Sequence, residues 1–441
     1  MKILLVMPDA GIHKIRLFGR DISFRDAPLT LATLAARIPP ELDVELVAVD
    51  ESVRRLPERI DFDLVGISCL TGTAFRAYDL ARFYRERGAR IVLGGVHVTL
   101  RPEEAARHAD AIVTGFAEHA WPELLRDFAA GRLKPRYDGG NPDLAGMTFP
   151  RRDVQNRHQY LVGNSVFATR GCKGVCEFCS IPAAHVQWRT RPAGEVIDEI
   201  RSLPGRRFGF NDVSITEDRD YALELFRAIE PLKRTWGGLA TSRIGEDEEL
   251  LDAMADSGCR FLLLGLESVS TESLAGIGKG FNRVDRYHSL VEKLHARGIC
   301  IQGCFIFGME ADGPSVFRET VERVNDLGID IPRYAVFTPY PGTRAHGRLQ
   351  AEGRLLHEYW PHYDTQHVVF QPARMSPEAL DAGFRRAFRE TYSLSAIRRR
   401  CRRSPRPAIT FLGNLAYRRY LRRLESGDRI HHAGGRVGAA A

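Results

Sequence analysis

The chain has 441 residues, of which 44% are hydrophobic and 27% are charged, an ordinary globular composition. No stretch is long and apolar enough to cross a bilayer, and the first residues lack a secretory signal pattern, so we expect a cytoplasmic protein of two or three domains. The net charge of +7 is local, because arginines gather near the end of the chain, over residues 398–423.

Strands and helices alternate over the first 130 residues. Short apolar strands are predicted with helices between them, the strands at 2–8, 43–50, 62–70, 90–100 and 109–115. This rhythm predicts a doubly wound parallel sheet of the flavodoxin-like type, whose ligands lie at the carboxyl ends of the strands. Those ends are the segments 68–73, 94–97 and 115–119.

A second βα series follows a segment rich in Gly, Pro, Arg and Asp that ends near residue 160. Six strands are predicted in this series, at 164–170, 207–215, 235–244, 260–268, 299–309 and 333–343. Six βα units are too few for a complete eight-fold barrel, so we expect a partial barrel. A late helix begins after Ser376, which stands in capping position, and the arginine-rich tail follows it.

Three of the eight cysteines stand within eight positions, as "CKGVCEFC": Cys172, Cys176 and Cys179. A structural zinc site would usually bring two cysteine pairs, which the chain lacks, although zinc with a distant histidine stays an alternative. Three cysteines on one loop can instead hold a 4Fe–4S cluster with one iron left open, and an open metal position is typical of a catalytic site. Four other cysteines lie in apolar runs and are interpreted as small buried hydrophobes: Cys69, Cys259, Cys300 and Cys304.

The CxxxCxxC spacing, with Phe178 before its last cysteine, resembles the signature of the radical S-adenosylmethionine (radical SAM) superfamily. The resemblance implies that the open iron chelates SAM and that reductive cleavage gives a 5′-deoxyadenosyl radical, which takes hydrogen from an unactivated carbon. The stretches "GLES", "FIFGM" and "TPYPGT" also match family strand ends. The chain departs from many members in lacking a proline after "FIFG", which puts the geometry of that loop in doubt.

The resemblance also implies a set of SAM contacts at the ends of the barrel strands. Arg243 could pair with the SAM carboxylate, and a glutamate that ends an apolar strand, such as Glu267, is rarely a core residue. The complete predicted set is Phe178, Asn211, Asp212, Glu217, Ser242, Arg243, Glu267 and Ser268.

The first domain resembles the cobalamin-binding domain that precedes the radical SAM barrel in one large subfamily, most closely over residues 94–125. The implied cobalamin contacts are Ser68, Thr71, Thr73, Gly94, Gly95, His97, Gly115 and Glu118. The DxHxxG motif that supplies a cobalt ligand elsewhere is missing, so His13 and His97 are expected at most as hydrogen-bond partners. A first domain that binds no cofactor and only shapes the pocket stays open, because the fold alone cannot decide.

Together these features predict a cobalamin-binding-like domain over 1–140, a linker over 141–160, a radical SAM core over 161–375 and a helical arginine-rich region over 376–441. The expected activity is C-methylation of a small-molecule or lipid-like substrate, with a ferredoxin or flavodoxin as electron donor. A radical oxidative cyclisation and an RNA-modifying transferase are the alternatives. A nucleic-acid substrate is not expected, because the tail lacks interleaved aromatic pairs.

The tail itself allows two interpretations. From Ile409 onward its apolar residues recur at helical spacing, with arginines between them. Such a helix can lie on an anionic membrane surface, or it can dock its apolar stripe on the barrel and leave the arginines solvated. Docking is the preferred interpretation.

Overall fold

The computed structural model describes residues 1–9, 11, 14–17 and 20–425. Its first sheet has six parallel strands in the order β4-β1-β5-β6-β7-β8. The strands are β1 (Lys2–Met7), β4 (Glu45–Asp50), β5 (Leu64–Ser68), β6 (Arg90–Gly94), β7 (Ala111–Thr114) and β8 (Arg136–Asp138). The first five of these follow the 2-1-3-4-5 order of flavodoxin-like folds, which confirms the predicted fold class.

Helices cover both faces of this sheet, which explains why its strands read as continuous apolar runs. Ile3, Leu4, Leu5 and Val6 of β1 are all inaccessible to solvent. The helices are α1 (Thr30–Ala36), α2 (Ala74–Arg85), α3 (Val96–Leu100), α4 (Pro102–Ala106) and α5 (Ala117–Ala129), with the 3-10 turn η1 (Thr71–Thr73). The strand predicted over 90–100 is shorter than expected, because Gly95 takes a φ of +99° and turns the chain into α3.

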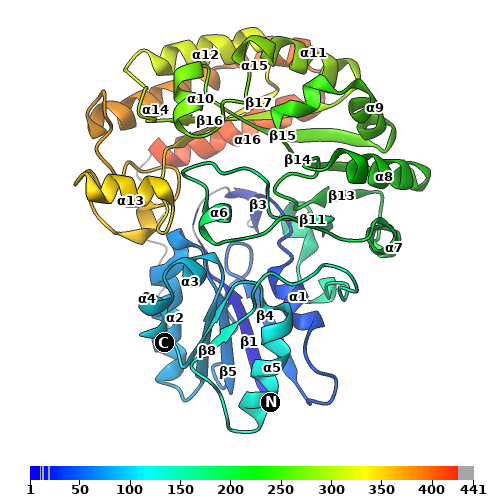
Figure 1. Ribbon diagram of the computed structural model, residues 1–441, viewed down its shortest axis with the longest axis vertical. Helices are drawn as coiled ribbons and strands as arrows, with labels where there is room; N and C mark the ends of the chain where they lie inside the picture. Colours follow the sequence, from blue (N-terminus) through cyan, green and yellow to red (C-terminus); the bar gives the residue numbers. More distant parts are fainter. Residues whose placement is uncertain (10, 12–13, 18–19, 426–441) are drawn as a thin grey trace.

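The second sheet is the predicted partial barrel. Its strands are all parallel and follow one another in chain order. They are β10 (Ser165–Val166), β13 (Arg207–Phe210), β14 (Thr235–Ala240), β15 (Cys259–Glu267), β16 (Cys300–Phe307) and β17 (Ile331–Val336). Figure 1 shows this arc of strands above the first sheet, with helices along its outer side.

The outer helices alternate with the barrel strands. They are α7 (Ala193–Ser202), α8 (Arg219–Ile229), α9 (Glu248–Asp256), α10 (Thr271–Gly276), α11 (Tyr287–Ala296) and α12 (Val316–Leu327). Short 3-10 turns join them: η4 (Glu230–Leu232), η5 (Ser242–Glu246) and η6 (Val284–Arg286). The strand β11 (Thr169–Arg170) pairs antiparallel with β12 (Arg189–Thr190), and α6 (Ser180–Ala183) lies between them in the chain.

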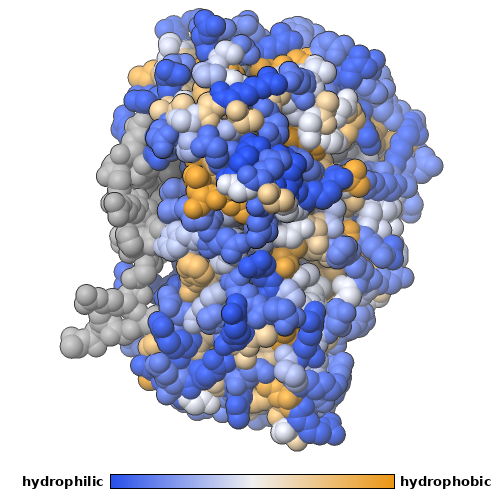
Figure 2. All heavy atoms as spheres, turned by 60° about the vertical axis from the view of Figure 1, so that its left-hand side comes forward, coloured by the Kyte–Doolittle hydropathy of each residue, from blue (hydrophilic) through white to orange (hydrophobic). Residues whose placement is uncertain are grey.

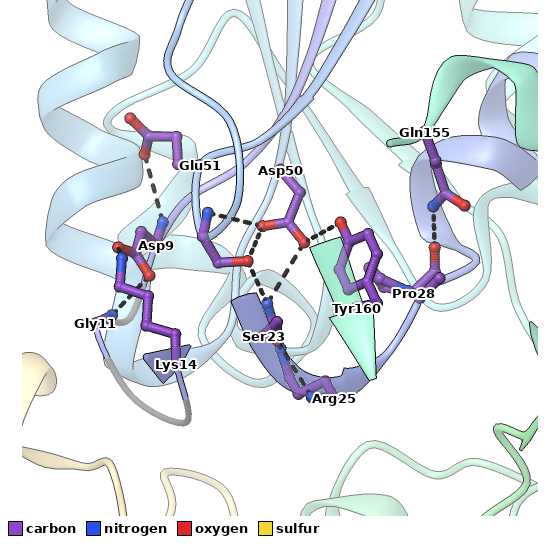
Figure 3. A network of polar contacts seen from close by, with 12 residues as sticks. Asp9, Gly11, Lys14, Ser23, Arg25, Pro28, Asp50, Glu51, Gln155 and Tyr160 are labelled. Carbon is purple, nitrogen blue, oxygen red and sulfur yellow. Dashed lines mark hydrogen bonds and ion pairs between the residues drawn. The ribbon is translucent and has the colours of Figure 1, made fainter. Parts of the chain in front are cut away.

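A small third sheet joins the two large ones. It contains β2 (Lys14–Leu17), β3 (Arg20–Asp26) and β9 (Tyr160–Val162). Asp50, at the end of β4, accepts hydrogen bonds from Ser52 Oγ (2.6 Å) and Tyr160 OH (2.9 Å), and Arg25 Nη2 lies 3.4 Å away (Figure 3). The buried carboxylate therefore ties the first sheet to the third.

The segment predicted as a linker contains two 3-10 turns and the start of β9, the turns being η2 (Arg152–Val154) and η3 (Arg157–Gln159). The division of the chain into 1–140, 141–160, 161–375 and 376–441 stays a prediction.

The helix α13 (Arg344–Ala351) and the 3-10 turn η7 (Trp360–His362) follow the last barrel strand. The described part of the region after Ser376 is helical, as expected, and contains α14 (Pro377–Thr391), α15 (Leu394–Arg403) and α16 (Pro407–Glu425). Ser376 caps α14 by accepting a hydrogen bond from Ala379 N, as the sequence predicted. The helix α16 contacts β17 and β2 and buries Tyr417, Tyr420 and Leu421, so the described part of the tail docks on the body.

Polar side chains dominate the face of the molecule in Figure 2, where apolar residues form small separate patches. Within the described ranges, no helix is both long and apolar enough to cross a membrane.

Candidate active site

The loop with the three cysteines leaves the barrel between β11 and α6. Gly171 takes a φ of +81°, and a Cβ there would lie 2.6 Å from Gln187 O, so only glycine fits this close turn. Gly174 N lies 3.2 Å from Cys172 Sγ, and a Cβ at Gly174 would lie 3.3 Å from that sulfur and 3.9 Å from Cys176 Sγ. The loop thus folds tightly around the sulfur atoms.

The chemistry of these thiols fits a multi-iron cluster. Burial raises the pKa of Cys172, Cys176 and Cys179, and a bound metal cation favours the thiolate form of each of them. Within the described residues, no three His, Cys, Asp or Glu side chains converge as a single bound ion requires. A cluster of several irons spreads its thiolate ligands over its corners and needs no such convergence.

Lys279 lies beside these cysteines, and the sequence analysis did not predict it as a site residue. Its Nζ lies 2.6 Å from Glu267 Oε1, and burial would lower its pKa, but the Glu267 carboxylate outweighs that effect and raises it. The cation also acts electrostatically on Cys176 and Cys179. The glycines that flank Lys279 in "IGKGF" were the available signal, because they indicate a tight loop near a ligand.

The predicted SAM contacts divide into two groups. Phe178, Glu217 and Glu267 lie near the cysteines: Cys172 Sγ is 3.7 Å from Glu217 Oε1, and Phe178 packs edge-on against Phe337. Ser242, Ser268 and Arg243 form contacts within the barrel, and their role in SAM binding stays a prediction. Ser242 Oγ donates to Asn282 Oδ1 at 2.6 Å, Ser268 Oγ accepts from Ser270 N at 3.0 Å, and the Arg243 guanidinium lies 4.2 Å from the Phe281 ring centre.

Asp212 has a structural role that its loop position did not suggest. It is buried, and its carboxylate accepts hydrogen bonds from Ala168 N (3.1 Å), Thr169 N (2.5 Å) and Thr169 Oγ1 (2.7 Å). Burial raises the pKa of Asp212 to about 6, against the opposing effect of these donors. Asp212 therefore fixes the strand that enters the cysteine loop.

A cavity of about 570 Å³ lies between the first sheet and the barrel. The first sheet contributes its carboxyl edge, with Ser68, Gly94, Gly95, Gly115 and Glu118 in the wall. The barrel contributes Phe167, Thr169, Arg170, Gly171, Ile181 and Asn211. The wall thus reaches from the predicted ligand edge of the flavodoxin-like sheet to both ends of the cysteine loop.

Three predicted cobalamin contacts lie outside this wall. His97 is inaccessible to solvent, and its ring nitrogens lie 3.3 Å from Thr71 Oγ1 and 3.2 Å from Tyr78 OH. Thr73 Oγ1 accepts from Leu70 N at 3.1 Å. The contacts of Thr71, Thr73 and His97 shown here lie within the first domain, and their contact with cobalamin stays a prediction; His13 lies outside the described residues.

The residues of the cavity fit a large cofactor with a polar rim. Apolar side chains from both domains, such as Leu70, Val96, Phe116 and Ile181, line most of it. Glu118, Trp121 and Arg170 add polar atoms that have no hydrogen-bond partner within the described chain. Gly94 and Gly95 keep the strand end free of side chains at this edge.

Comparisons with known proteins agree with both the cysteine loop of the barrel and the ligand edge of the first sheet. The radical SAM superfamily profile matches residues 166–338, the B12 binding domain profile matches 24–125, and a domain of unknown function matches 343–408. Bacteriochlorophyllide d C-8(2)-methyltransferase of Chlorobaculum tepidum is 30% identical over 91% of this chain and 94% of its own length. The C-12(1)-methyltransferase of the same organism is also 30% identical, over 90% of this chain and 89% of its own.

Solved structures share the fold. The methyltransferase TsrM from Kitasatospora setae, with cobalamin and a 4Fe–4S cluster bound, has a TM-score of 0.65 at 19% sequence identity. The match covers 80% of this chain and 78% of the TsrM chain. The cobalamin-dependent radical enzyme OxsB has a TM-score of 0.64 at 14% sequence identity, and the match covers 96% of this chain and 72% of the OxsB chain. On this evidence the chain belongs to the cobalamin-binding radical SAM enzymes of the class B methyltransferase type, which use a 4Fe–4S cluster, SAM and cobalamin.

Proposed function

We propose that this enzyme methylates an unactivated carbon of a small, largely apolar substrate, with cobalamin in the interdomain cavity and the cluster on Cys172, Cys176 and Cys179. The observation that carries the proposal is the continuity of the cavity wall from Gly94 and Gly115 to Gly171 and Ile181. A cobalamin in this cavity lies next to the cysteine loop. The methyl group on cobalamin and a SAM molecule at the cluster can therefore both reach one carbon of the substrate. When bound, the cluster supplies the electron that cleaves SAM, and the cobalamin carries the methyl group.

The chain's own residues orient these groups. Asp212 fixes the strand that enters the cysteine loop, as its three hydrogen bonds indicate. Lys279 places a positive charge near Cys176 and Cys179, where a thiolate-bound cluster is anionic, and Glu267 opposes its electrostatic effect on both thiols. Lys279 and Glu267 also offer a donor and an acceptor suited to the carboxylate and amino groups of SAM.

The overall reaction balances with two molecules of SAM. The substrate hydrogen leaves as part of 5′-deoxyadenosine, and one SAM is thereby converted to methionine. The second SAM gives its methyl group and leaves as S-adenosylhomocysteine. The two electrons that this stoichiometry requires come from a one-electron donor protein, for which we propose a ferredoxin or a flavodoxin.

The substrate class follows from the relatives that align over nearly their whole length. Two of them are named for methylation of bacteriochlorophyllide d, a tetrapyrrole with alkyl side chains. We therefore propose a flat, largely apolar small molecule of this kind as the first substrate to test.

The test is an anaerobic reaction with bacteriochlorophyllide d and SAM labelled with a trideuterated methyl group. We expect product that carries the labelled methyl on a side-chain carbon, detected by mass spectrometry. A ring-closed or oxidised product without label would replace methylation by oxidative cyclisation, the reaction named for relatives that are 24% identical. Failure with bacteriochlorophyllide d and with a panel of isoprenoid and tetrapyrrole substrates would overturn the proposed substrate class.

A further inference from the structure

Three residues in the cavity wall carry buried polar atoms that have no hydrogen-bond partner within the described chain. The atoms are Glu118 Oε2, Trp121 Nε1 and Arg170 Nη1. Trp121 is 2% exposed, and the Arg170 and Glu118 side chains are 12% and 13% exposed. Buried polar atoms are almost always paired in folded proteins, so three such atoms around one cavity indicate a missing ligand.

The geometry holds these residues together across the domain boundary. Glu118 and Trp121 lie one turn apart on α5 of the first domain, whereas Arg170 ends β11 on the barrel side. Arg170 Nη2 donates to Glu118 Oε1 at 2.5 Å, and the guanidinium stacks 3.9 Å from the Phe116 ring centre. Each partner of the ion pair thus keeps one atom that the other does not satisfy.

We propose that Glu118, Trp121 and Arg170 bind carboxamide groups on the rim of the cofactor. The inference rests on the proposed placement of cobalamin in this cavity. A primary carboxamide accepts through its C=O and donates through its NH₂, and the three residues offer two donors and one acceptor. An anionic group would meet the carboxylate of Glu118 in a buried site, whereas a neutral amide leaves the ion pair intact. The corrin ring of cobalamin carries such amides around its rim.

The first test measures the affinity of hydroxocobalamin by its visible absorbance on titration into the iron-loaded protein. Trp121→Phe keeps the apolar ring and removes one donor, so we expect about fivefold weaker binding, the equivalent of one hydrogen bond. Trp188→Phe is the matched control, because Trp188 Nε1 is also buried without a partner but Trp188 is not part of the cavity wall. Equal affinity of both variants and the unchanged protein would overturn the role of Trp121.

The second test uses a set of six cobalamin monocarboxylic acids, in each of which one of the six primary amides of the corrin ring is replaced by a carboxylate. At least one of them should bind the unchanged protein more than tenfold more weakly than cobalamin, because its carboxylate meets Glu118. Glu118→Gln removes that charge, and its side-chain NH₂ can donate to the ligand carboxylate, so this variant should recover most of the loss. If all six acids bind as cobalamin does, the amide recognition is wrong.

The outcomes separate this inference from the proposed function. A protein that binds no cobalamin at all contradicts the proposed cofactor site and, with it, the inference. A protein that binds cobalamin tightly, with the same affinity in Trp121→Phe and Arg170→Met and with no discrimination against the acids, contradicts the inference alone. Circular dichroism and iron content of each variant show that the fold and the cluster are retained.

Discussion

Lys279 Nζ lies 2.6 Å from Glu267 Oε1, and Glu267 ends β15 with a left-handed φ of +64°. Such a conformation is strained for a residue with a side chain, and strain of this kind concentrates at functional sites. A Cβ at Gly265 would lie 2.4 Å from Glu267 Oε1 and 2.9 Å from Lys279 Nζ. A side chain at position 265 would therefore displace the carboxylate of Glu267 and the ammonium group of Lys279 from their present positions.

Lys279→Met should remove the charge beside Cys176 and Cys179 and leave Glu267 buried without its partner. We expect at least tenfold slower formation of 5′-deoxyadenosine and weaker SAM binding, since a lost buried ion-pair partner is costly. Equilibrium dialysis with labelled SAM and chromatography of the products measure both. Lys293→Met is the control, because Lys293 pairs with the exposed Glu248 on the outside of the barrel. If Lys279→Met binds and cleaves SAM as this control does, Lys279 has no role in SAM binding or cleavage.

Cys176→Ala should abolish 5′-deoxyadenosine formation and most of the iron content, and the same holds for Cys172 and Cys179. Three thiolates are the minimum for a site-differentiated cluster, so loss of one leaves a second iron without a protein ligand. The matched control is Cys401→Ala, on α15, which should keep the iron. An anaerobically reconstituted Cys176→Ala protein with a full 4Fe–4S spectrum and product formation would show that the assignment is wrong.

Burial raises the pKa of Asp26 from 3.8 to about 6. The folded state therefore binds more protons than the unfolded state between about pH 4 and 6, and the free energy of unfolding falls as the pH rises through this window. Asp26→Asn removes the buried charge and should raise the free energy of unfolding at pH 7 by about 2–3 kcal/mol, with no gain at pH 4. Urea unfolding at both pH values measures this, and a variant that is less stable at pH 7 would contradict it.

Sequence reasoning recovered the fold because the βα rhythm and the strand ends are local signals. The six barrel strands were predicted from apolar runs of strand length. The alternation of strands and helices limits the first sheet to a few possible strand orders. The site was recovered only in part, because contacts between distant segments have no local signature. Arg170 and Glu118 are 52 residues apart and meet only when both domains fold. Asp212 and Ser242 stand at strand ends, as ligand residues do, yet their hydrogen bonds are to neighbouring loops.

The exposed residues of the C-terminal helices bear on the predicted membrane contact. Leu394, Ile409, Phe411 and Leu412 are 46–66% exposed, whereas Tyr417, Tyr420 and Leu421 are buried. Within the described part of the tail, a peripheral contact can therefore use the first turns of α15 and α16, with nearby arginines each contributing about 1 kcal/mol on an anionic surface.

Phe411→Glu combined with Leu412→Glu tests this contact without disturbing the docked residues Tyr417 and Tyr420. If the contact exists, the unchanged protein cosediments with anionic vesicles at low salt and the double variant does not. The control Ile60→Glu changes an exposed apolar residue of the first domain and should bind as the unchanged protein does. Equal sedimentation of all three proteins would remove the membrane role.

The most direct test of the central claim follows two products of SAM in one anaerobic reaction with reductant. We predict that 5′-deoxyadenosine forms only when Cys172, Cys176 and Cys179 are all present. S-Adenosylhomocysteine should form only when cobalamin is supplied. If S-adenosylhomocysteine appears equally without cobalamin, or never appears in a protein that makes 5′-deoxyadenosine, the cobalamin-dependent account is contradicted.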